Sequence, residues 1–403
     1  MILDGIGDRA CRALEGKTPL EAAKTPNLDW FASKGKVDYC YPVREGYVPE
    51  SDAGVVSLLG YDIGNVYRGS LEALGLGIKL RNGDLAFRCN FATVDGLGKE
   101  EGNVLDRRAG RTLTTHEARV LARAINSEVK LPFKFEFYPS VQHRGVLVIR
   151  GGFSNNISNV DAKDGKIVFS NALDDEEEGG KLSTELVNNF VRQSYEVLNK
   201  HPINLRRARK GLFAANVLLC RGAGNEVPRF KKLKGKWMSS ADMPLEIGIA
   251  RAVGMEIYRS KHPKFRGIDV YANLYAALKK NIKYSVRMLR RYSKKYDYFY
   301  VHFKATDLPG HDNKPLDKTR MIEMIDERFF GFLRKFIGER RLVVTGDHST
   351  PCSLKAHSDE PVPVLSFNCA NVKAGERRFT EREGLKGRRW VGRKLLEGTL
   401  FKK

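Results

Sequence analysis

The stretch RLVVTGDHSTPCSLKAHSDEPVP, Arg341–Pro363, joins a short apolar run to three side chains that can bind metal. Its LVVTG portion predicts a buried strand that runs into a loop, where Asp347 and His348 follow directly and His357 comes later. In open α/β sheets, ligands gather at the carboxyl ends of strands. Carboxylate and imidazole together suit zinc or manganese. The stretch therefore predicts an α/β fold with a metal site at a strand end; the alternative is a turn that holds two histidines by chance.

A second stretch, YDYFYVHFKATDLPGH at Tyr296–His311, has the same organisation. An aromatic strand over about Tyr298–Phe303 is followed by Asp307 and His311. A lone Asp-x-x-x-His pair is weak evidence, because such pairs arise by chance on loops. Two strand-end clusters in the C-terminal third favour a shared two-metal site, with the ligands Asp307, His311, Asp347, His348 and His357.

Composition and length indicate a packed globular protein of two domains. The chain has 403 residues, of which 42% are hydrophobic. No apolar run approaches the length of a membrane span, and the start of the chain lacks the layout of a signal peptide. The six cysteines are scattered without a C-x-x-C pair, which argues against a zinc ribbon or a disulfide framework. We predict a cytoplasmic protein without membrane contact.

The charge is strongly positive, with 70 Lys and Arg against 48 Asp and Glu, a net charge of +22. Three interpretations stay open: association with nucleic-acid phosphates, attraction of a small anionic substrate, or a surface simply rich in Lys and Arg. Basic residues are spread along the whole chain rather than gathered in one tail. We expect no specific nucleic-acid partner, and the sequence leaves the oligomeric state open.

Two further candidates lie in the N-terminal region. Asp4 follows Ile2-Leu3, which looks like the end of a strand whose beginning is missing, so either the start codon is assigned late or the strand is unusually short. Asp4 is a sixth candidate ligand; the alternative is an ordinary turn aspartate. Ser51 begins a predicted helix that Gly60 ends. A serine at a helix N-terminus faces free N–H groups, which suits a hydroxyl that becomes an alkoxide and carries phosphate; the alternative is a plain N-cap serine.

From about Ile78 the sequence pattern in the middle of the chain differs from that of the N-terminal region. Strand-like runs with basic turns, such as DRRAGR at Asp106–Arg111, alternate with an amphipathic helix near Lys181–Leu198. After Asn225 the α/β alternation returns. We predict a metal-binding α/β core over residues 1–77 and 226–403, with an inserted α+β domain over residues 78–225 that binds substrate as a lid.

Taken in order, the candidates are Asp4, Ser51, Asp307, His311, Asp347, His348 and His357. This order resembles that of the alkaline phosphatase superfamily, and within it the archaeal-type cofactor-independent phosphoglycerate mutases. The resemblance is carried by ILDGIGDR, GKTPLEAAKTPNLD, GDLAFRCNFATVD, DRRAGR, GIARAVGM, ATDLPGHD and GDHSTPCSLKAHSDEPVP, which span nearly the whole chain. The chain departs from the family where PGSDTAHL is usual: it reads PESDAGVV, with Glu50 for a glycine and Val55 for a histidine.

The resemblance implies an α/β, alkaline-phosphatase-like sandwich with a mostly parallel sheet flanked by helices, plus an inserted smaller α+β domain. It implies two divalent metal ions, manganese or alternatively magnesium, zinc or cobalt. One would be held by Asp307, His311 and His357, and the other by Asp4, Ser51, Asp347 and His348, with Ser51 as nucleophile. A hydroxyl is a poor nucleophile at neutral pH, and metal coordination would make an alkoxide available.

The implied activity is interconversion of 2- and 3-phosphoglycerate through a phosphoserine, without 2,3-bisphosphoglycerate, in glycolysis and gluconeogenesis. Arginine clamps carboxylate and phosphate in a bidentate manner. The candidates for substrate binding are Arg88, Arg107, Arg108, Arg111 and Arg221, with Asp106 as a possible acid or base. Two alternatives stay open: a phosphatase or other phosphomutase on the same scaffold, and a basic nucleic-acid-binding module with a decayed site.

Overall fold

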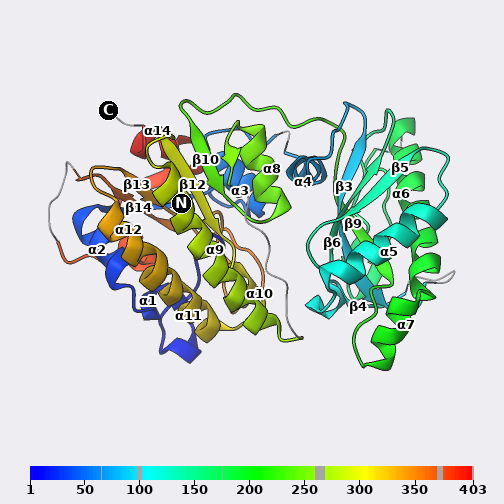
Figure 1. Cartoon of the computed structure of the whole chain (residues 1–403), viewed down its shortest axis with the longest axis horizontal. Helices are drawn as coiled ribbons and strands as arrows, with labels where there is room; N and C mark the ends of the chain where they lie inside the picture. Colours follow the sequence, from blue (N-terminus) through cyan, green and yellow to red (C-terminus); the bar gives the residue numbers. More distant parts are fainter. Residues whose placement is uncertain (65, 98–101, 175, 259–267, 370–374, 402–403) are drawn as a thin grey trace.

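The computed structural model describes the chain except for residues 65, 98–101, 175, 259–267, 370–374 and 402–403. The chain forms two lobes (Figure 1). The lobe at the left holds the N-terminus and the C-terminal helix, and the lobe at the right is built from the middle of the sequence, coloured cyan to green. We call them the core lobe and the inserted lobe, after the predicted division at residues 78 and 225. That division into domains stays a prediction.

The core lobe is built on two four-stranded sheets that meet at the N-terminus. The first is entirely parallel, in the order β1 (Ile2–Leu3), β12 (Tyr298–Phe303), β10 (Trp237–Ser240) and β11 (Glu256–Ile257). The second is mixed, in the order β13 (Leu342–Val344), β14 (Val362–Phe367), β2 (Lys36–Tyr41) and β15 (Arg389–Val391). The amide of Leu3 donates to the carbonyl of Thr345 at 2.9 Å, and the amide of Thr345 donates to the carbonyl of Met1 at 3.2 Å. These bonds join the two sheets, so the loops after β1, β12 and β13 lie at one edge.

Helices cover both faces of this joined sheet. One face packs against α2, α9 and α11 through residues such as Phe31, Leu278 and Met321, and the other packs against α3, α8 and α14 through Val55 and Leu245. The helices of the core lobe are α1 (Pro19–Ala22), α2 (Pro26–Lys34), α3 (Ser51–Leu58), α4 (Arg68–Leu76), α8 (Pro244–Ala252), α9 (Val270–Tyr292), α10 (Asp307–His311), α11 (Pro315–Ile325), α12 (Gly331–Phe336), α13 (Glu381–Gly384) and α14 (Gly392–Thr399). The predicted α/β layering, with a mostly parallel sheet flanked by helices, is confirmed.

The inserted lobe is a five-stranded antiparallel sheet covered by helices. Its strand order is β4-β3-β6-β5, and β9 pairs with β3. Helices α5 and α6 pack on the sheet around a core that includes Phe91, Leu121, Phe137 and Phe190. Its elements are β3 (Leu85–Val94), β4 (Val104–Asp106), α5 (Thr115–Glu128), β5 (Phe135–Pro139), β6 (Arg144–Ile149), β7 (Asp161–Lys163), β8 (Lys166–Val168), α6 (Glu178–Asn199), α7 (Pro202–Arg209) and β9 (Val217–Gly224).

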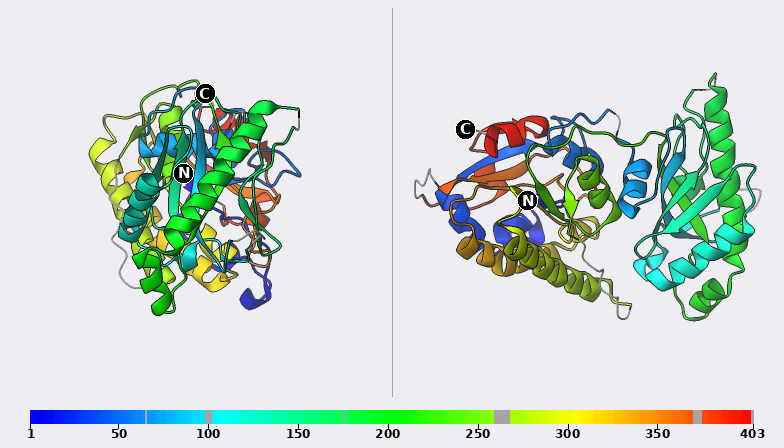
Figure 2. Two further views of the ribbon diagram at one scale, coloured as in Figure 1. Left: turned by 90° about the vertical axis from the view of Figure 1, so that its right-hand side faces the viewer. Right: turned by 45° about the horizontal axis from the view of Figure 1, so that its top comes forward.

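Helix α4 lies between the two lobes, as the right-hand view of Figure 2 shows. It packs against α8 of the core lobe and against β3 and β9 of the inserted lobe. Glycines make these approaches possible, because a Cβ on Gly75 would come within 1.8 Å of the Pro244 carbonyl oxygen and one on Gly69 within 2.1 Å of the Ala86 oxygen. The helix is therefore packed tightly against both lobes.

A buried aspartate interrupts the long helix that follows α10. The sequence predicts one helix over about Lys318–Phe336, but a π-turn, η3 (Asp326–Phe330), separates α11 from α12. The Asp326 carboxylate accepts hydrogen bonds from the amides of Leu28 at 2.6 Å and Asn27 at 3.2 Å. It thereby supplies the N-terminus of α2 with a cap from another helix, because Thr25 makes no side-chain cap bond of its own.

A carboxyl group near the N-terminal loop is expected to make stability depend on pH. Glu381 accepts from the Asp8 amide at 3.2 Å and from the Thr18 hydroxyl at 2.8 Å, and burial raises its pKa to about 7. A raised folded-state pKa favours the protonated form, so this contribution is present below pH 4.5 and is lost as the pH rises through 7. We expect Glu381→Gln to reduce the fall in unfolding free energy between pH 5 and 8 by about 1–3 kcal/mol, measured by urea titration. The exposed Glu397→Gln is the control, and equal pH slopes for both variants would contradict the assignment.

A search of the helices in the described residues found none that is both long and apolar enough to cross a membrane.

Candidate active site

Three strand-end loops of the core lobe bring the predicted acidic residues to one place. Asp4 follows β1, Asp307 begins α10 shortly after β12, and Asp347 follows β13. Asp4 and Asp347 are fully buried. Gly5 allows this convergence, because its φ is +59° and a Cβ there would lie 2.9 Å from an Asp307 carboxylate oxygen. Segments far apart in the sequence thus form one acidic cluster, as the parallel arrangement of β1 and β12 requires.

Ser51 reaches the cluster from the first turn of α3. Gly54 lets the helix approach the loop after β13 closely. A Cβ at this position would lie 2.1 Å from the Asp347 carbonyl oxygen and collide with it. Ser51 Oγ lies 3.2 Å from Nε2 of His348 and accepts a hydrogen bond from the Lys304 ammonium at 3.3 Å. The hydroxyl thus faces an imidazole and an ammonium, as expected of a nucleophile held for activation.

Three histidines present the same ring nitrogen to the cluster. Nδ1 of His311 lies 3.0 Å from the Lys355 carbonyl oxygen, and Nδ1 of His357 lies 3.0 Å from that of Pro49. Nδ1 of His348 lies 3.0 Å from the Thr350 hydroxyl. With Nδ1 engaged by an oxygen, each ring has Nε2 left for the cluster, which is how metal-binding histidines are oriented in proteins. Nε2 lies 3.4 Å from Asp307 Oδ1 for His311 and 3.7 Å from it for His357.

The donor set fits divalent cations. Two groups have all their ligand atoms within 4.8 Å of one another, Asp4 with Asp347 and His348, and Asp307 with His348 and His357. Asp4 Oδ1 and Asp347 Oδ2 are buried, yet neither accepts a hydrogen bond from the described residues. Buried carboxylate oxygens need such a partner, and a cation would supply it. The predicted ligands thus lie together. One difference is that Asp307 and His357 are grouped with His348, whereas the predicted set for that metal has His311.

The electrostatics also indicate a cation site. Burial acts to lower the pKa of His348, but Asp347 and Asp4 raise it to about 9. Asp307 is half-buried, and although desolvation acts to raise its pKa, hydrogen bonding to His357 and the nearby imidazoles hold that pKa well below the usual range. The carboxylates thus favour a protonated His348 in spite of its burial. A bound divalent cation would supply the positive charge in place of that proton.

A partly buried cation of the protein itself lies next to Ser51. The Lys304 ammonium donates to Asp4 Oδ2 at 2.6 Å and lies 2.9 Å from Glu246 Oε1. His302 Nε2 is 2.8 Å from the same Asp4 oxygen, and its Nδ1 is 2.8 Å from the Tyr300 hydroxyl. Asp4, Glu246 and His302 form a third group with the spacing of metal ligands. Because the ammonium already lies between Asp4 and Glu246, we assign this group to Lys304.

Lys304, Glu246 and His302 were not among the residues predicted from the sequence. A signal was present for two of them, because β12 ends at Phe303 and side chains alternate along a strand. His302 and Lys304 therefore point to the same side as each other, toward Asp4. Glu246 lies on α8 and had no comparable signal.

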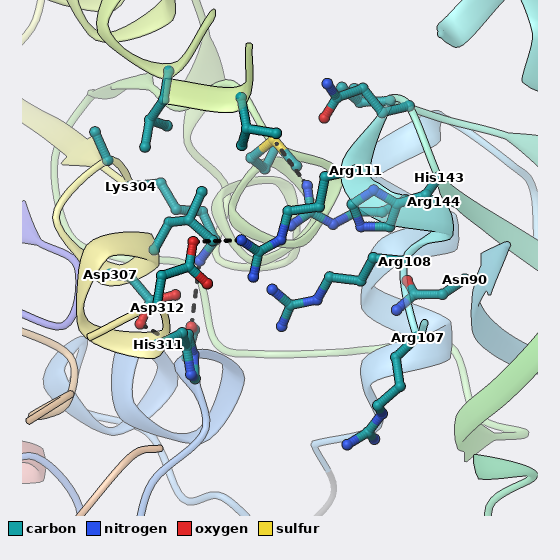
Figure 3. Close-up of a pocket in the computed structure, with 18 of the residues that line it drawn as sticks. Asn90, Arg107, Arg108, Arg111, His143, Arg144, Lys304, Asp307, His311 and Asp312 are labelled. Atoms are coloured by element: carbon teal, nitrogen blue, oxygen red, sulfur yellow. Dashed lines mark hydrogen bonds and ion pairs between the residues drawn. The ribbon is translucent and has the colours of Figure 1, made fainter. Parts of the chain in front are cut away.

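A cavity of about 1190 Å³ extends from this cluster to the inserted lobe. Its lining includes all six residues that were predicted to bind substrate: Arg88, Asp106, Arg107, Arg108, Arg111 and Arg221. His143, just before β6, and Arg144, the first residue of β6, line it too and were not chosen from the sequence. Figure 3 shows Arg107, Arg108, Arg111 and Arg144 on the inserted-lobe side, opposite Asp307 and His311. Their roles in binding stay predictions.

The arginines of the cavity differ in how closely carboxylates of the protein pair with their positive charge. Arg107 and Arg221 share Asp161, at 2.5 and 3.2 Å, and Arg88 lies 3.6 Å from Glu72. Burial and neighbouring arginines lower the pKa of Arg108 to about 10. A cluster of cations that repel one another beside a nucleophile is the electrostatic signature of an anion site.

His143 is neutral within this basic cluster. Its side chain is buried, and neither ring nitrogen has a hydrogen-bond partner among the described residues. Burial lowers its pKa well below the usual value, and Arg144 and Arg108 lower it further. A neutral imidazole can donate to or accept from a substrate hydroxyl or carboxylate.

Asp106 has a structural task. Its Oδ1 accepts hydrogen bonds from the amides of Arg108 at 2.7 Å and Gly110 at 2.8 Å. These bonds hold the DRRAGR turn in shape. The predicted acid or base role of Asp106 stays a prediction.

The sequence of this chain is similar to those of known proteins over nearly its whole length. Residues 32–204 match the family model of 2,3-bisphosphoglycerate-independent phosphoglycerate mutase. A protein of that name from Thermococcus gammatolerans is 41% identical over 398 residues, covering 96% of this chain and 92% of the relative. One from Methanopyrus kandleri is 42% identical over 372 residues, 90% of this chain and 85% of the relative. The chain belongs to this family.

Solved structures agree with the assignment to the mutase family. A protein from Pyrococcus horikoshii, PH0037, is 32% identical with a TM-score of 0.75, covering 99% of this chain and 95% of that chain. The cofactor-independent phosphoglycerate mutase of Thermoplasma acidophilum is 28% identical with a TM-score of 0.56, covering 99% and 98%. The predicted α/β fold class, with a mostly parallel sheet flanked by helices, is confirmed, and the likeness to the Thermoplasma acidophilum mutase extends over nearly the whole chain.

Glu50 and Val55, the two predicted departures from the mutase pattern, lie in different surroundings. Val55 is buried in the hydrophobic core one helical turn after Ser51, and it does not line the cavity. Glu50 lies at the rim of the cavity, with Oε2 3.1 Å from Arg68 and Oε1 3.8 Å from Nδ1 of His357. Its side chain is largely exposed; partial desolvation acts to raise its pKa, but Arg68 and His357 lower that pKa to about 2. Of the two, Glu50 alone adds charge to the cavity.

Proposed function

We propose that this chain interconverts 2-phosphoglycerate and 3-phosphoglycerate through a phosphoserine on Ser51, without 2,3-bisphosphoglycerate, in glycolysis and gluconeogenesis in the cytoplasm. The observation that carries the proposal is the position of Ser51 Oγ between Lys304 and His348, facing a cavity lined by arginines. A phosphorylated three-carbon acid carries negative charge at both ends. The chain offers it a nucleophile on one wall and clustered guanidinium groups on the other.

The chain's own residues divide the work of phosphoryl transfer. Lys304 stabilises negative charge on Ser51 Oγ, and Glu246 keeps the ammonium in place. Backbone N–H groups at the start of α3 face the oxygens of a phosphoryl group attached there. Divalent cations bound by the predicted ligands would lower the pKa of the Ser51 hydroxyl and neutralise the phosphoryl oxygens.

A mutase must also keep the glycerate while Ser51 holds the phosphate. The arginines of the inserted lobe bind the carboxylate of the intermediate, and His143 contacts its hydroxyls. The glycerate turns within the cavity and takes the phosphoryl group back on its other hydroxyl. Water must stay out during this step, which is the role we assign to the inserted lobe, residues 78–225, as a lid.

We propose two divalent cations, with manganese as the first candidate and magnesium, zinc or cobalt as alternatives. Purified protein reconstituted with Mn²⁺ should convert 3-phosphoglycerate in an enolase-coupled assay without added 2,3-bisphosphoglycerate. Excess EDTA should remove at least about 99% of the activity, because a direct metal contribution to phosphoryl transfer is worth several kcal/mol. Elemental analysis before and after chelation measures the ions. Full activity in protein shown to be free of metal would contradict the assignment.

The alternative is a phosphatase on the same scaffold, which the extra carboxylate of Glu50 at the cavity rim favours. In that case the release of inorganic phosphate from 3-phosphoglycerate would exceed the formation of 2-phosphoglycerate. Glu50→Gly, which restores the usual family residue, should then shift the ratio toward isomerisation. A ratio that stays low in the unaltered protein excludes this alternative.

A further inference from the structure

One arginine of the cavity forms a close ion pair with a carboxylate beside the candidate metal ligands of the core lobe. Arg111 Nη1 of the inserted lobe lies 2.6 Å from Asp312 Oδ2 of the core lobe, as Figure 3 shows. The same carboxylate oxygen accepts a hydrogen bond from the Tyr271 hydroxyl at 2.9 Å. The three side chains therefore bridge the cavity mouth, and Asp312 follows directly on the candidate ligand His311.

The turn that carries Arg111 is strained and held from several sides. Ala109, Gly110 and Arg111 have φ values of 47°, 64° and 56°, which are unfavourable for alanine and arginine. Asp106 holds the turn from within, and the Arg207 guanidinium donates to the Ala109 carbonyl oxygen at 3.4 Å. Strain that persists because its surroundings enforce it is found at functional sites.

The opposite side of the bridge is anchored equally well. Tyr271 lies in the first turn of α9, where the Asp269 carboxylate accepts from its amide at 2.9 Å and from that of Ala272 at 3.0 Å. The Lys314 ammonium lies 3.8 Å from the centre of the Tyr271 ring. Tyr271 of α9 and Asp312, at the C-terminal end of α10, thus converge on the Arg111 guanidinium.

We propose that Arg111, Asp312 and Tyr271 form a latch that holds the two lobes closed while Ser51 carries the phosphoryl group. Arg111 is then a positioning residue rather than a substrate ligand. The inference rests on the proposed mutase function. With the latch open, water enters and takes the phosphoryl group from Ser51 Oγ, giving inorganic phosphate and a free serine hydroxyl. The latch therefore sets the partition between isomerisation and hydrolysis.

The chain offers a matched control one helical turn further along α9. The Tyr275 hydroxyl donates to Asp317 Oδ1 at 2.9 Å, which repeats the tyrosine–aspartate pair within the core lobe. The test compares Tyr271→Phe, Asp312→Asn and their double variant with Tyr275→Phe/Asp317→Asn, all in the metal-loaded full chain. Tyr271→Phe removes one hydroxyl away from the metal ligands, so it reports on the latch even if Asp312→Asn disturbs His311.

We expect the latch variants to release about tenfold or more phosphate per isomerisation than the control, with a lower kcat and a KM for 3-phosphoglycerate within about twofold. Their radius of gyration in small-angle X-ray scattering should increase, while metal content stays the same. Asp312→Glu keeps the carboxylate and should therefore have a ratio of isomerisation to hydrolysis close to that of the unaltered enzyme. The proposal would be overturned if Tyr271→Phe, Asp312→Asn and the double variant all kept the ratio of hydrolysis to isomerisation and the radius of gyration of the unaltered enzyme. If the unaltered enzyme shows no isomerisation, the proposed function fails, and scattering still decides whether the latch closes the lobes.

Discussion

Ser51→Ala is expected to lower mutase turnover by at least about 10⁴-fold, because removing a serine nucleophile eliminates the covalent route and leaves only residual binding effects. Ser51 Oγ is the one hydroxyl that lies within 3.3 Å of both His348 Nε2 and the Lys304 ammonium among the bonds of the described residues. The enolase-coupled assay measures the rate. Rapid quenching followed by peptide mass spectrometry measures phosphoryl transfer to Ser51.

Ser57→Ala is the control, since Ser57 is buried in the same helix but does not line the cavity. It should retain nearly all the activity and the phosphoserine on Ser51. A stable phosphoryl label on another residue of the Ser51→Ala variant would assign the nucleophile elsewhere. Metal content should be compared in both proteins, because Ser51 is itself a predicted ligand.

Lys318→Met is expected to reduce the free energy of unfolding by about 3–5 kcal/mol, because removing one partner of a buried ion pair leaves the other charge unpaired. Lys318 is fully buried, and its ammonium donates to Asp8 Oδ2 at 2.8 Å and to the carbonyl oxygens of Thr350 at 3.0 Å and Gly7 at 3.2 Å. These bonds tie the loop after β1 to the loop after β13, which together carry four of the predicted ligands. Urea unfolding measures the change.

The double variant Lys318→Met/Asp8→Asn should recover part of the loss, because it also removes the unpaired carboxylate. Lys335→Met, at an exposed position of α12, should change stability by less than about 0.5 kcal/mol. A Lys318→Met variant as stable as the Lys335→Met variant would show that the buried pair contributes nothing.

Local patterns in the sequence predicted the elements that carry the chemistry. The strand over Tyr298–Phe303 is confirmed at both ends, and α3 begins at Ser51 as expected. An apolar run predicted the strand, because a strand of a buried parallel sheet needs apolar residues on both faces. At β9 a local pattern is misleading: the small residues of RGAG, Arg221–Gly224, suggest a turn, but they continue the strand beside β3.

The sequence by itself therefore determined the strand-end positions of Asp4, Asp307 and Asp347, and the helix start at Ser51, because hydrophobic periodicity and capping are local. Only the tertiary structure decided that Glu246 of α8 faces Lys304, that Asp326 caps another helix, and that Arg111 is bound to Asp312. Those contacts join residues tens to hundreds of positions apart. Whether a charged side chain meets substrate, cation or carboxylate depends on which surfaces pack together, and spacing along the chain carries no record of that.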